Sequence, residues 1–244
     1  MPNVRSITLL VAFCAWCCAC PVAQFAESRP TSHLTVQTPN RIQGIIERVK
    51  RAQADTMVSA PYRIARSYRV FPTNNERKVW EVVAEVVFRP PNQKSYTIRK
   101  SSGNSHVDEA VRQILEREVE ASAQGRQIPT AALLEGNYQT IYLGESEVEG
   151  HPCYRIALTP MRIDKNLVVG DAWVDQQSFL VRKVEGDMVR SPSWWVKKVH
   201  VTFVFGDLAG DWIQTSSKSV ADIRIFGSHT MESKTLPAGT AMLR

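Results

Sequence analysis

The sequence predicts an α+β fold: an antiparallel half-barrel whose open, strongly curled sheet of roughly ten strands holds helices in its concave face. First, apolar residues alternate with a period of two in short segments from residue 61 onward, and these segments fill nearly all of the chain after residue 136. Second, amphipathic helical patterns occur only in the first half. Third, short turns join the strand segments, as in a meander. Because a sheet of about ten strands tends to curl, its concave face is where the helices can bury their apolar stripes.

The N-terminal residues 1–23 have the pattern of a secretory signal. Arg5 precedes an apolar run from Ile7 to Ala19, and the chain then becomes polar. A membrane-spanning helix needs about 20 apolar residues, so an uncleaved anchor is the second choice and lipid attachment at Cys20 is the third. We expect a cleaved signal, a loose segment over residues 24–35, and a mature chain in the periplasm.

The cysteines support this compartment. Of the five cysteines, only Cys153 lies after the predicted signal, so the mature chain can form no internal disulfide. A single cysteine fits a Gram-negative periplasm better than a disulfide-stabilised extracellular module. We interpret Cys153 as a small buried residue rather than as a nucleophile.

The charge of the chain argues against a nucleic-acid partner. The formal net charge is +6 at pH 7, and the sequence contains no long run of Lys and Arg. The densest group is Arg48, Lys50 and Arg51, at the end of the first predicted helix. It is either a solvated helix face or a contact for an anionic lipid surface or an acidic partner.

Helical spacing occurs in two segments. The first runs from about Val36 to Met57, and its apolar stripe consists of Ile42, Ile45, Ile46 and Val49. The second runs from Ser105 to Gln124, and its stripe consists of Val107, Val111, Ile114, Leu115 and Val119. Each stripe is narrow, so each helix must lie with one side on the sheet.

Strand patterns account for most of the remaining chain. In the segment Lys78–Pro90 one face is wholly apolar and the other mixed, as expected for a sheet with a single core side; the apolar face is Trp80, Val82, Ala84, Val86 and Phe88. The other predicted strands are Pro61–Pro72, Gln93–Lys100, Asn137–Gly144, His151–Thr159, Asn166–Asp175, Phe179–Val189, Trp194–Phe205, Asp211–Val220 and Ala221–Met231.

The sequence contains no recognisable catalytic constellation. It has no Gly-x-Ser-x-Gly motif, and its five histidines form no zinc-binding pattern. His106 with Asp108 and Glu109 is interpreted as the first turn of a helix rather than as a metal site. Asp171 and Asp175 share one strand face. We interpret them as polar strand residues near a turn rather than as a carboxylate pair for acid–base catalysis. We therefore expect no catalytic residue, no metal ligand and no cofactor.

Aromatic and apolar side chains on strands are the alternative to an active site. Most of them must form an ordinary core, but a concave face larger than its helices can fill would leave a cavity for acyl chains. The expected lining is Trp80, Val82, Val86, Phe88, Tyr142, Ile156, Leu158, Trp173, Val201 and Phe203. The expected lid over it is the stripe Ile42, Ile45, Ile46 and Val49.

Two strands resemble a pair found in the LolA/LolB/RseB-like superfamily. These are Gly170–Asp175, with its Trp-x-Asp motif, and Phe179–Gly186, and the hairpin Tyr138–Leu158 fits the same pattern. The order of elements is similar as well, so that the resemblance covers roughly residues 36–231. It implies a half-barrel with helices at its mouth, in a non-enzymatic periplasmic carrier or receptor of lipoproteins or a lipid-binding stress sensor. The basic, tryptophan-rich stretch Ser191–Lys198 departs from the carrier pattern.

We therefore expect a LolA-like lipid-binding half-barrel over residues 36–236 and a tail over 237–244. The predicted function is a periplasmic lipoprotein- or lipid-binding carrier that shields acyl chains, in keeping with outer-membrane lipoprotein sorting. Expected partners are lipid or lipoprotein acyl chains and, as a second class, envelope proteins of the inner or outer membrane. The first alternative is an envelope interaction or stress-signalling module with a filled core. The second is a secreted hydrolase of unrecognised type.

Overall fold

The structure is a computed structural model, and it describes residues 39–56, 61–125, 136–164, 167–191, 196–208, 210–224 and 227–237. The predicted signal, the loose segment and the tail beyond residue 237 lie outside the described residues, so these boundaries stay predictions. The tryptophans of the stretch Ser191–Lys198 also lie outside them.

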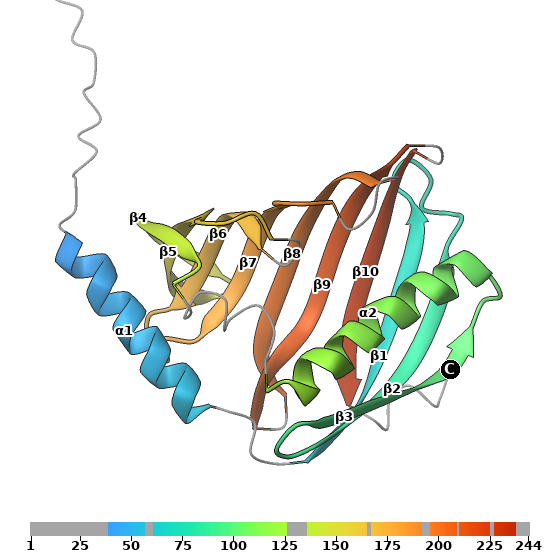
Figure 1. The fold of residues 1–244 in the computed structure, drawn as a ribbon, viewed down its shortest axis with the longest axis horizontal. Helices are drawn as coiled ribbons and strands as arrows, with labels where there is room; N and C mark the ends of the chain where they lie inside the picture. Colours follow the sequence, from blue (N-terminus) through green and yellow to red (C-terminus); the bar gives the residue numbers. More distant parts are fainter. Residues whose placement is uncertain are drawn as a thin grey trace, which may run out of the picture. The chain divides into compact units, whose positions relative to one another are not determined.

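The described residues form two helices and ten strands (Figure 1). The helices are α1 (Pro39–Asp55) and α2 (Ser105–Ala123). The strands are β1 (Tyr62–Pro72), β2 (Trp80–Arg89), β3 (Gln93–Ser101), β4 (Tyr138–Val148), β5 (His151–Pro160), β6 (Val168–Asp175), β7 (Val181–Met188), β8 (Val196–Leu208), β9 (Asp211–Ile223) and β10 (Gly227–Pro237).

All ten strands form one antiparallel sheet in the order β3-β2-β1-β10-β9-β8-β7-β6-β5-β4. Its two ends, β3 and β4, do not pair with each other, so the sheet is open, and it curls around the helices (Figure 1). The predicted fold class, an antiparallel α+β half-barrel, is confirmed.

The strand register defines one continuous inner face, the face on which both helices pack. One row of directly opposed residues crosses nine strands from β4 to β2: Tyr142, Ile156, Ala172, Val184, Phe203, Ser217, Ser233, Tyr68 and Val82. This row is mainly apolar toward both ends and polar in the middle, where β9 and β10 each contribute a serine. The inner face thus has two apolar halves separated by a polar strip.

A pair of opposed glycines lies between β6 and β7. A Cβ atom added to Gly170 would lie 2.0 Å from the Glu185 carbonyl oxygen, and one added to Gly186 would lie 2.2 Å from the Val169 carbonyl oxygen. No side chain fits at these distances, so this close backbone approach requires glycine on both strands. The pair belongs to the inner face, because Gly170 and Gly186 alternate in step with Ala172 and Val184.

Two strand boundaries differ from the prediction. The prediction that one strand ends at Val220 and the next begins at Ala221 is wrong. β9 continues to Ile223, and the next strand begins at Gly227, which has a φ of 74°. β4 continues past Gly144, where a bulge with a φ of 121° interrupts the register without ending the pairing. A glycine at positive φ can therefore mark either a turn, as at Gly227, or a bulge inside a strand, as at Gly144.

The two helices begin differently. Asn104 caps α2, its side-chain oxygen accepting from the backbone N–H of His106 at 3.1 Å and of Val107 at 3.2 Å. Asp108 lies in the first turn and accepts from the Ser101 hydroxyl at 2.6 Å. These residues therefore stabilise a helix N-terminus, as predicted. α1 has no acidic residue in its first turn and no basic residue in its last.

Candidate functional site

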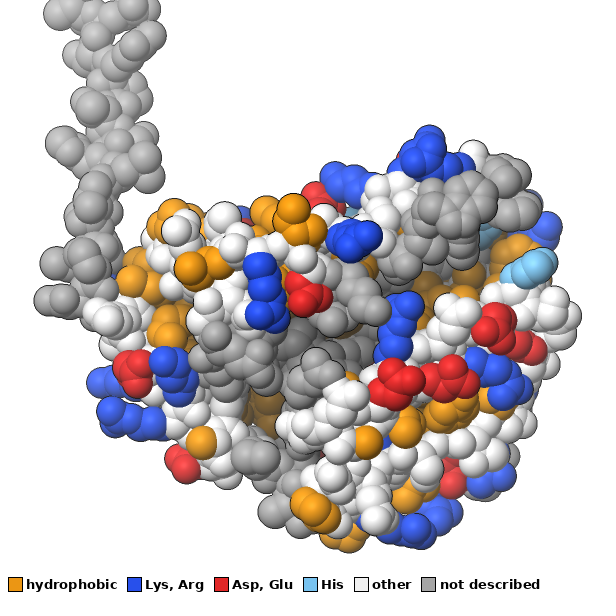
Figure 2. All heavy atoms as spheres, in the orientation of Figure 1, with side chains coloured by type: hydrophobic (Ala, Val, Ile, Leu, Met, Phe, Trp, Pro, Cys, Tyr) orange, Lys and Arg blue, Asp and Glu red, His pale blue; other side chains and the backbone are white. Residues whose placement is uncertain are grey.

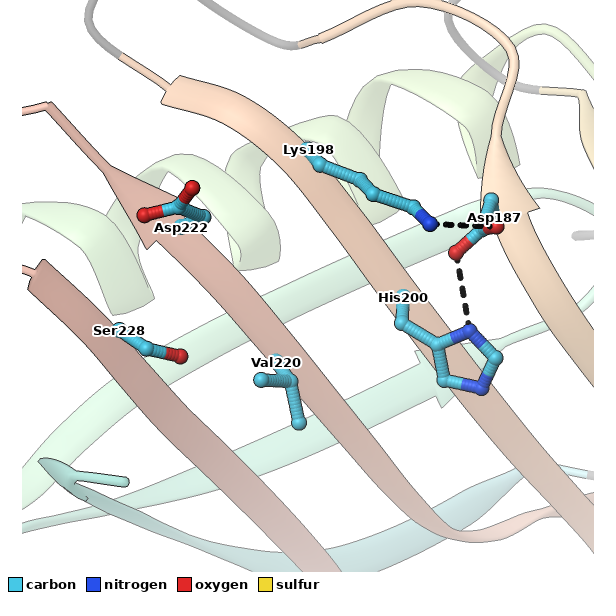
Figure 3. Close-up of a pocket in the computed structure, with 6 residues that line it drawn as sticks. All are labelled: Asp187, Lys198, His200, Val220, Asp222 and Ser228. Atoms are coloured by element: carbon cyan, nitrogen blue, oxygen red, sulfur yellow. Dashed lines mark hydrogen bonds and ion pairs between the residues drawn. The ribbon is translucent and has the colours of Figure 1, made fainter. Parts of the chain in front are cut away.

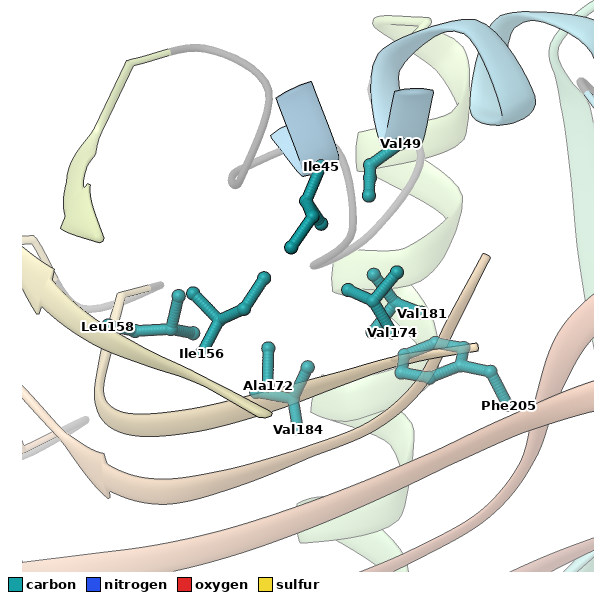
Figure 4. Close-up of a cluster of buried hydrophobic side chains, with 9 residues drawn as sticks. All are labelled: Ile45, Val49, Ile156, Leu158, Ala172, Val174, Val181, Val184 and Phe205. Carbon is teal, nitrogen blue, oxygen red and sulfur yellow. The ribbon is translucent and has the colours of Figure 1, made fainter. Parts of the chain in front are cut away.

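The stripe of α1 rests on the half of the inner face formed by β5 to β8. Ile45 is 5% exposed and Val49 is 1% exposed. They pack in one cluster with seven buried strand residues (Figure 4): Ile156, Leu158, Ala172, Val174, Val181, Val184 and Phe205. We call these seven residues the α1 seat. It contains no polar side chain, so α1 is held there by the hydrophobic effect and packing.

The rim of this seat is incompletely covered. Eight hydrophobic side chains around it are only partly buried: Ile42, Ile46, Tyr138, Tyr142, Tyr154, Phe179, Phe203 and Trp212. An exposed ion pair joins α1 to the sheet at this rim, from Arg41 Nη2 to Glu145 Oε1 at 2.9 Å. Arg48 lies over the Phe179 ring at 5.0 Å. Exposed contacts of this kind each contribute at most about 1 kcal/mol.

The turn that joins β6 to β7 beside the seat is held by a buried carboxylate. Asp175 accepts from the backbone N–H groups of Ser178 at 2.7 Å and Gln177 at 3.0 Å, and from Arg182 Nε at 2.5 Å. Burial alone would raise the pKa of Asp175, but these donors outweigh it and lower the pKa to about 2. Asp175 therefore fixes the hairpin and is unsuited to accepting a catalytic proton at neutral pH.

α2 covers the other half of the inner face. Val107, Val111 and Leu115 pack in one cluster with six buried strand residues: Ile64, Tyr68, Val70, Val82, Ala84 and Val86. This second seat, unlike the first, adjoins buried charge. Arg66 Nη1 lies 2.5 Å from Glu118 Oε1 of α2, and Lys94 Nζ lies 3.7 Å from Glu118 Oε2.

Arg66 stays charged under α2, and Arg66 and Tyr68 both have unmet hydrogen-bonding capacity. Burial acts to lower the pKa of Arg66. The Glu118 carboxylate helps to raise it, the net pKa is raised, and the guanidinium stays charged. Burial raises the pKa of Tyr68 to about 12, so its hydroxyl stays protonated. The Arg66 guanidinium and the Tyr68 hydroxyl interact with each other, but the buried Arg66 Nε and Tyr68 Oη atoms have no well-formed hydrogen bond with the residues that the structure describes. A buried donor without a partner costs about 1–3 kcal/mol.

The outer face carries a shallow depression of about 290 Å³ (Figure 3). In it Asp187 lies 3.0 Å from both Lys198 Nζ and His200 Nδ1. Ser228 also lines the depression, but its hydroxyl lies 3.1 Å from Thr73 Oγ1, and β9 with Val220 separates it from His200. Two strand spacings amount to about 10 Å, so these residues do not form a nucleophile–base pair.

The structure divides the predicted lining residues between the two halves. Trp80, Val82 and Val86 belong to the α2 cluster, and Phe88 is 2% exposed and stacks on Tyr62 at 5.2 Å. At the α1 end the cluster includes or contacts Tyr142, Ile156, Leu158 and Phe203, whereas Val201 belongs to a third cluster that Phe203 also contacts. The ten residues are therefore distributed over more than one cluster.

Trp173 is the exception in orientation. Its neighbours Ala172 and Val174 take the inner positions of β6, so Trp173 lies on the outer face between Arg155 and Lys183. The Arg155 guanidinium lies 5.5 Å and the Lys183 ammonium 4.5 Å from its ring. The expectation that Trp173 lines the inner face is wrong, because small residues occupy that side beneath α1.

The four predicted lid residues occur together. Ile45 and Val49 are buried in the α1 cluster, and Ile42 and Ile46 are partly buried against it. Their action as a lid is part of the proposed function. Sequence analysis missed four residues of this half: Arg66, Tyr68, Lys94 and Glu118. On β1, Arg66 and Tyr68 have the same spacing of two as Ile64 and Val70, so they share the inner face with them.

Within the described ranges, no group of three or more His, Cys, Asp or Glu side chains could hold a metal ion. No helix among the same residues is long and apolar enough to cross a membrane. Charged side chains of both signs are interspersed over the face seen in Figure 2, with no large area of one sign.

The chain is similar to several solved structures at low sequence identity. A putative outer membrane lipoprotein-sorting protein domain from Vibrio parahaemolyticus has a TM-score of 0.44 and 11% identity, and the match covers 78% of this chain and 89% of that one. A DUF1329 family protein from Desulfovibrio piger has a TM-score of 0.40 and 12% identity, over 82% and 93%. A LolA superfamily protein from Nitrosomonas europaea has a TM-score of 0.37 and 12% identity, over 80% and 92%. No protein-family model and no curated protein matches the sequence.

Proposed function

We propose that this chain is a periplasmic carrier of lipids or lipoproteins, which shields acyl chains against the α1 seat and catalyses no reaction. The observation that carries the proposal is the contrast between a wholly apolar seat and a helix whose ion pair with the sheet, from Arg41 to Glu145, is exposed. A hydrocarbon chain can replace the contacts of Ile45 and Val49 without breaking a buried hydrogen bond. α1 is then the lid of the site.

The energetics favour such an exchange. Each methylene group moved from water into an apolar site contributes about 0.8 kcal/mol. A chain of about ten carbons thus gains more than the burial of two aliphatic side chains, at about 1.5–3 kcal/mol each. The partly buried aromatic rim would contact the part of the chain that the seat cannot accommodate.

The proposed role includes two further points that rest on the sequence. The predicted signal supports export to the periplasm. The predicted partners are lipoprotein acyl chains, with envelope proteins as donors and acceptors in lipoprotein sorting. For the rival hydrolase, the separation of His200 from Ser228 argues against an active site at this serine–histidine–aspartate grouping.

The test is competition between a fluorescent fatty acid and unlabelled alkanoates of increasing length, measured on the purified protein after delipidation. We expect the Kd to fall by up to about fourfold per added methylene until the seat is full. Native mass spectrometry before delipidation should show co-purified lipid. A protein that binds no alkanoate, or binds all lengths equally, would contradict the proposal and favour the interaction module with a filled core.

A substitution that fills the seat sharpens this test. Ala172→Leu adds bulk at a position that is 1% exposed and faces Ile45 and Val49 across the cluster. We expect at least tenfold weaker binding of a 16-carbon alkanoate. The matched control is Ala157→Leu on the outer face of the neighbouring strand, where Ala157 opposes Asp171; it should bind like wild type. Circular dichroism of both variants verifies that the sheet is retained, and equal binding by both would place the ligand elsewhere.

A further inference from the structure

The middle of the inner face is polar, and its polar groups adjoin unpartnered donors. Ser217 Oγ lies 2.7 Å from Ser233 Oγ, and the Thr235 hydroxyl donates to the Gln214 carbonyl at 2.8 Å. On the next strand Tyr68 directly opposes Ser233, and Arg66 directly opposes Thr235. We call Arg66, Tyr68, Ser217, Ser233 and Thr235 the polar strip. Directly opposed side chains lie about 5 Å apart, so these groups can converge on one small ligand group.

The charge balance beside the polar strip is positive. Two buried cations, Arg66 and Lys94, share the single carboxylate of Glu118, and the three side chains are 6%, 15% and 12% exposed. Burial lowers the pKa of Lys94, and Glu118 offsets part of that effect. Buried charge is stable only when it is paired and hydrogen-bonded. An additional anion would complete this cluster.

The unmet donors show where such an anion would bind. Arg66 is 5% exposed and Tyr68 is 2% exposed, and both retain a buried donor, Nε and Oη, without an acceptor among the described residues. Ser217 and Thr235, in the same strip, are only half-buried. Neither β9 nor β10 contributes a buried residue to the cluster of either helix. Among the described residues, a ligand that lies over these two strands would therefore displace only partly buried apolar side chains, such as Ile213 and Met231.

We infer that the polar strip binds the anionic oxygen head group, a carboxylate or a phosphate, of an amphiphile whose hydrocarbon part lies on the adjoining apolar inner face. Arg66 Nε and Tyr68 Oη each donate to a head-group oxygen, and the serine hydroxyls of β9 and β10 complete its hydrogen bonds. The inference deepens the proposed function and rests on it. The ligand class becomes an acyl chain with an acidic head rather than a neutral hydrocarbon.

Matched ligands test this inference. The Kd of hexadecanoate is compared with that of its methyl ester, which has the same chain and no charge. A hydrogen bond to a charged group is worth roughly a factor of ten or more in affinity, so wild type should bind the acid at least about tenfold more tightly than the ester. A ratio near one would overturn the inference and leave the carrier proposal intact, whereas no binding of either ligand would contradict both.

Variants assign the effect to the polar strip. Arg66→Gln should reduce the acid-to-ester ratio to about one with little change for the ester. Arg63→Gln is the control, since Arg63 lies on the same strand, on the outer face, with its side chain 60% exposed; it should keep the wild-type ratio. Because Arg66→Gln can fail to fold, Tyr68→Phe, which removes only the hydroxyl, is measured as well and should lower the ratio several-fold. Unchanged ratios in both inner-face variants would overturn the assignment.

Titration with free anions separates an amphiphile from a small ion. Calorimetry with inorganic phosphate and with acetate should show no binding at millimolar concentration, because neither ion has a chain to place on the apolar face. If phosphate binds wild type tightly and binds Arg66→Gln more weakly, the inference of an amphiphilic ligand is overturned. The polar strip is then a site for the free ion.

Discussion

The two helices of this protein cover the same face of one sheet, but they are held by different forces. α1 has an apolar seat, no acidic residue in its first turn and exposed polar ties. α2 has a side-chain N-cap, an apolar seat and a buried ion pair through Glu118. The hydrophobic contacts of α1 can be exchanged for those of another apolar molecule, whereas the ion pair of α2 cannot. The difference supports the proposal that α1, and not α2, is the lid.

The largest expected effect is at Glu118. Glu118→Gln removes the only described carboxylate beside Arg66 and Lys94, and leaving buried charge unpaired should lower the free energy of unfolding by about 3–5 kcal/mol. Denaturant unfolding measures it. The matched control is Glu116→Gln on the exposed side of the same helix, where Glu116 accepts from Tyr96 at 3.2 Å; it should change stability by less than about 1 kcal/mol. Similar losses in both variants would mean that α2 is not anchored by the buried pair.

The turn beside the α1 seat provides a pH-dependent prediction. The pKa of Asp175 is about 2 in the folded protein, whereas an unperturbed aspartate has a pKa of 3.8, so its ionised form favours folding. The contribution, about 2 kcal/mol, is fully present above pH 4 and is lost as the pH falls toward 2. Asp175→Asn should therefore unfold more easily than wild type at pH 7, with a difference that shrinks below pH 4. A difference that persists unchanged at pH 2 would show that the carboxylate charge is not its cause.

A pair of identical substitutions compares the helices directly. Val111 of α2 is 0% exposed and Val49 of α1 is 1% exposed. Val111→Ala should lower the global free energy of unfolding by about 2 kcal/mol. Val49→Ala should have a smaller global effect and instead accelerate hydrogen exchange of the α1 amides, because α1 opens locally. Equal global losses without faster exchange in α1 would show that both helices unfold only with the sheet.

The smallest effect is expected at the rim of the α1 seat. Glu145→Gln removes the carboxylate that Arg41 contacts, and both side chains are about half exposed. Exposed ion pairs contribute little because water and salt screen them. The free energy of unfolding should change by less than about 0.5 kcal/mol in urea titrations. A loss above about 1 kcal/mol would show that a polar contact fixes α1 and would weaken its role as a lid.

The sequence predicted the elements that depend on local periodicity. The apolar face of β2 and the stripe of α1 appear as expected. Side chains share a face every second residue in a strand and every third or fourth residue in a helix, so the apolar pattern assigns each side chain to a face. Trp173 was misplaced because periodicity separates the two faces without showing which one is inner. The cross-sheet relations were not predictable. Arg66 meets Glu118 only because α2 packs across β1, and the serines of β9 and β10 form a strip only through the register of distant strands.

Release of α1 from its seat is the claim on which the account depends, and linking α1 to the sheet tests it most directly. Arg41→Cys and Glu145→Cys can be joined by a short bis(methanethiosulfonate) reagent, which forms a reducible disulfide with each cysteine and releases methanesulfinate, since the native side chains meet at 2.9 Å. Cys153 is fully buried and burial raises its pKa to about 11, so it should not react with the reagent. The other four cysteines lie before residue 24 and are replaced by serine. We predict at least tenfold weaker binding of hexadecanoate in the linked protein and recovery upon reduction. Equal binding by the linked and unlinked protein would contradict the lid.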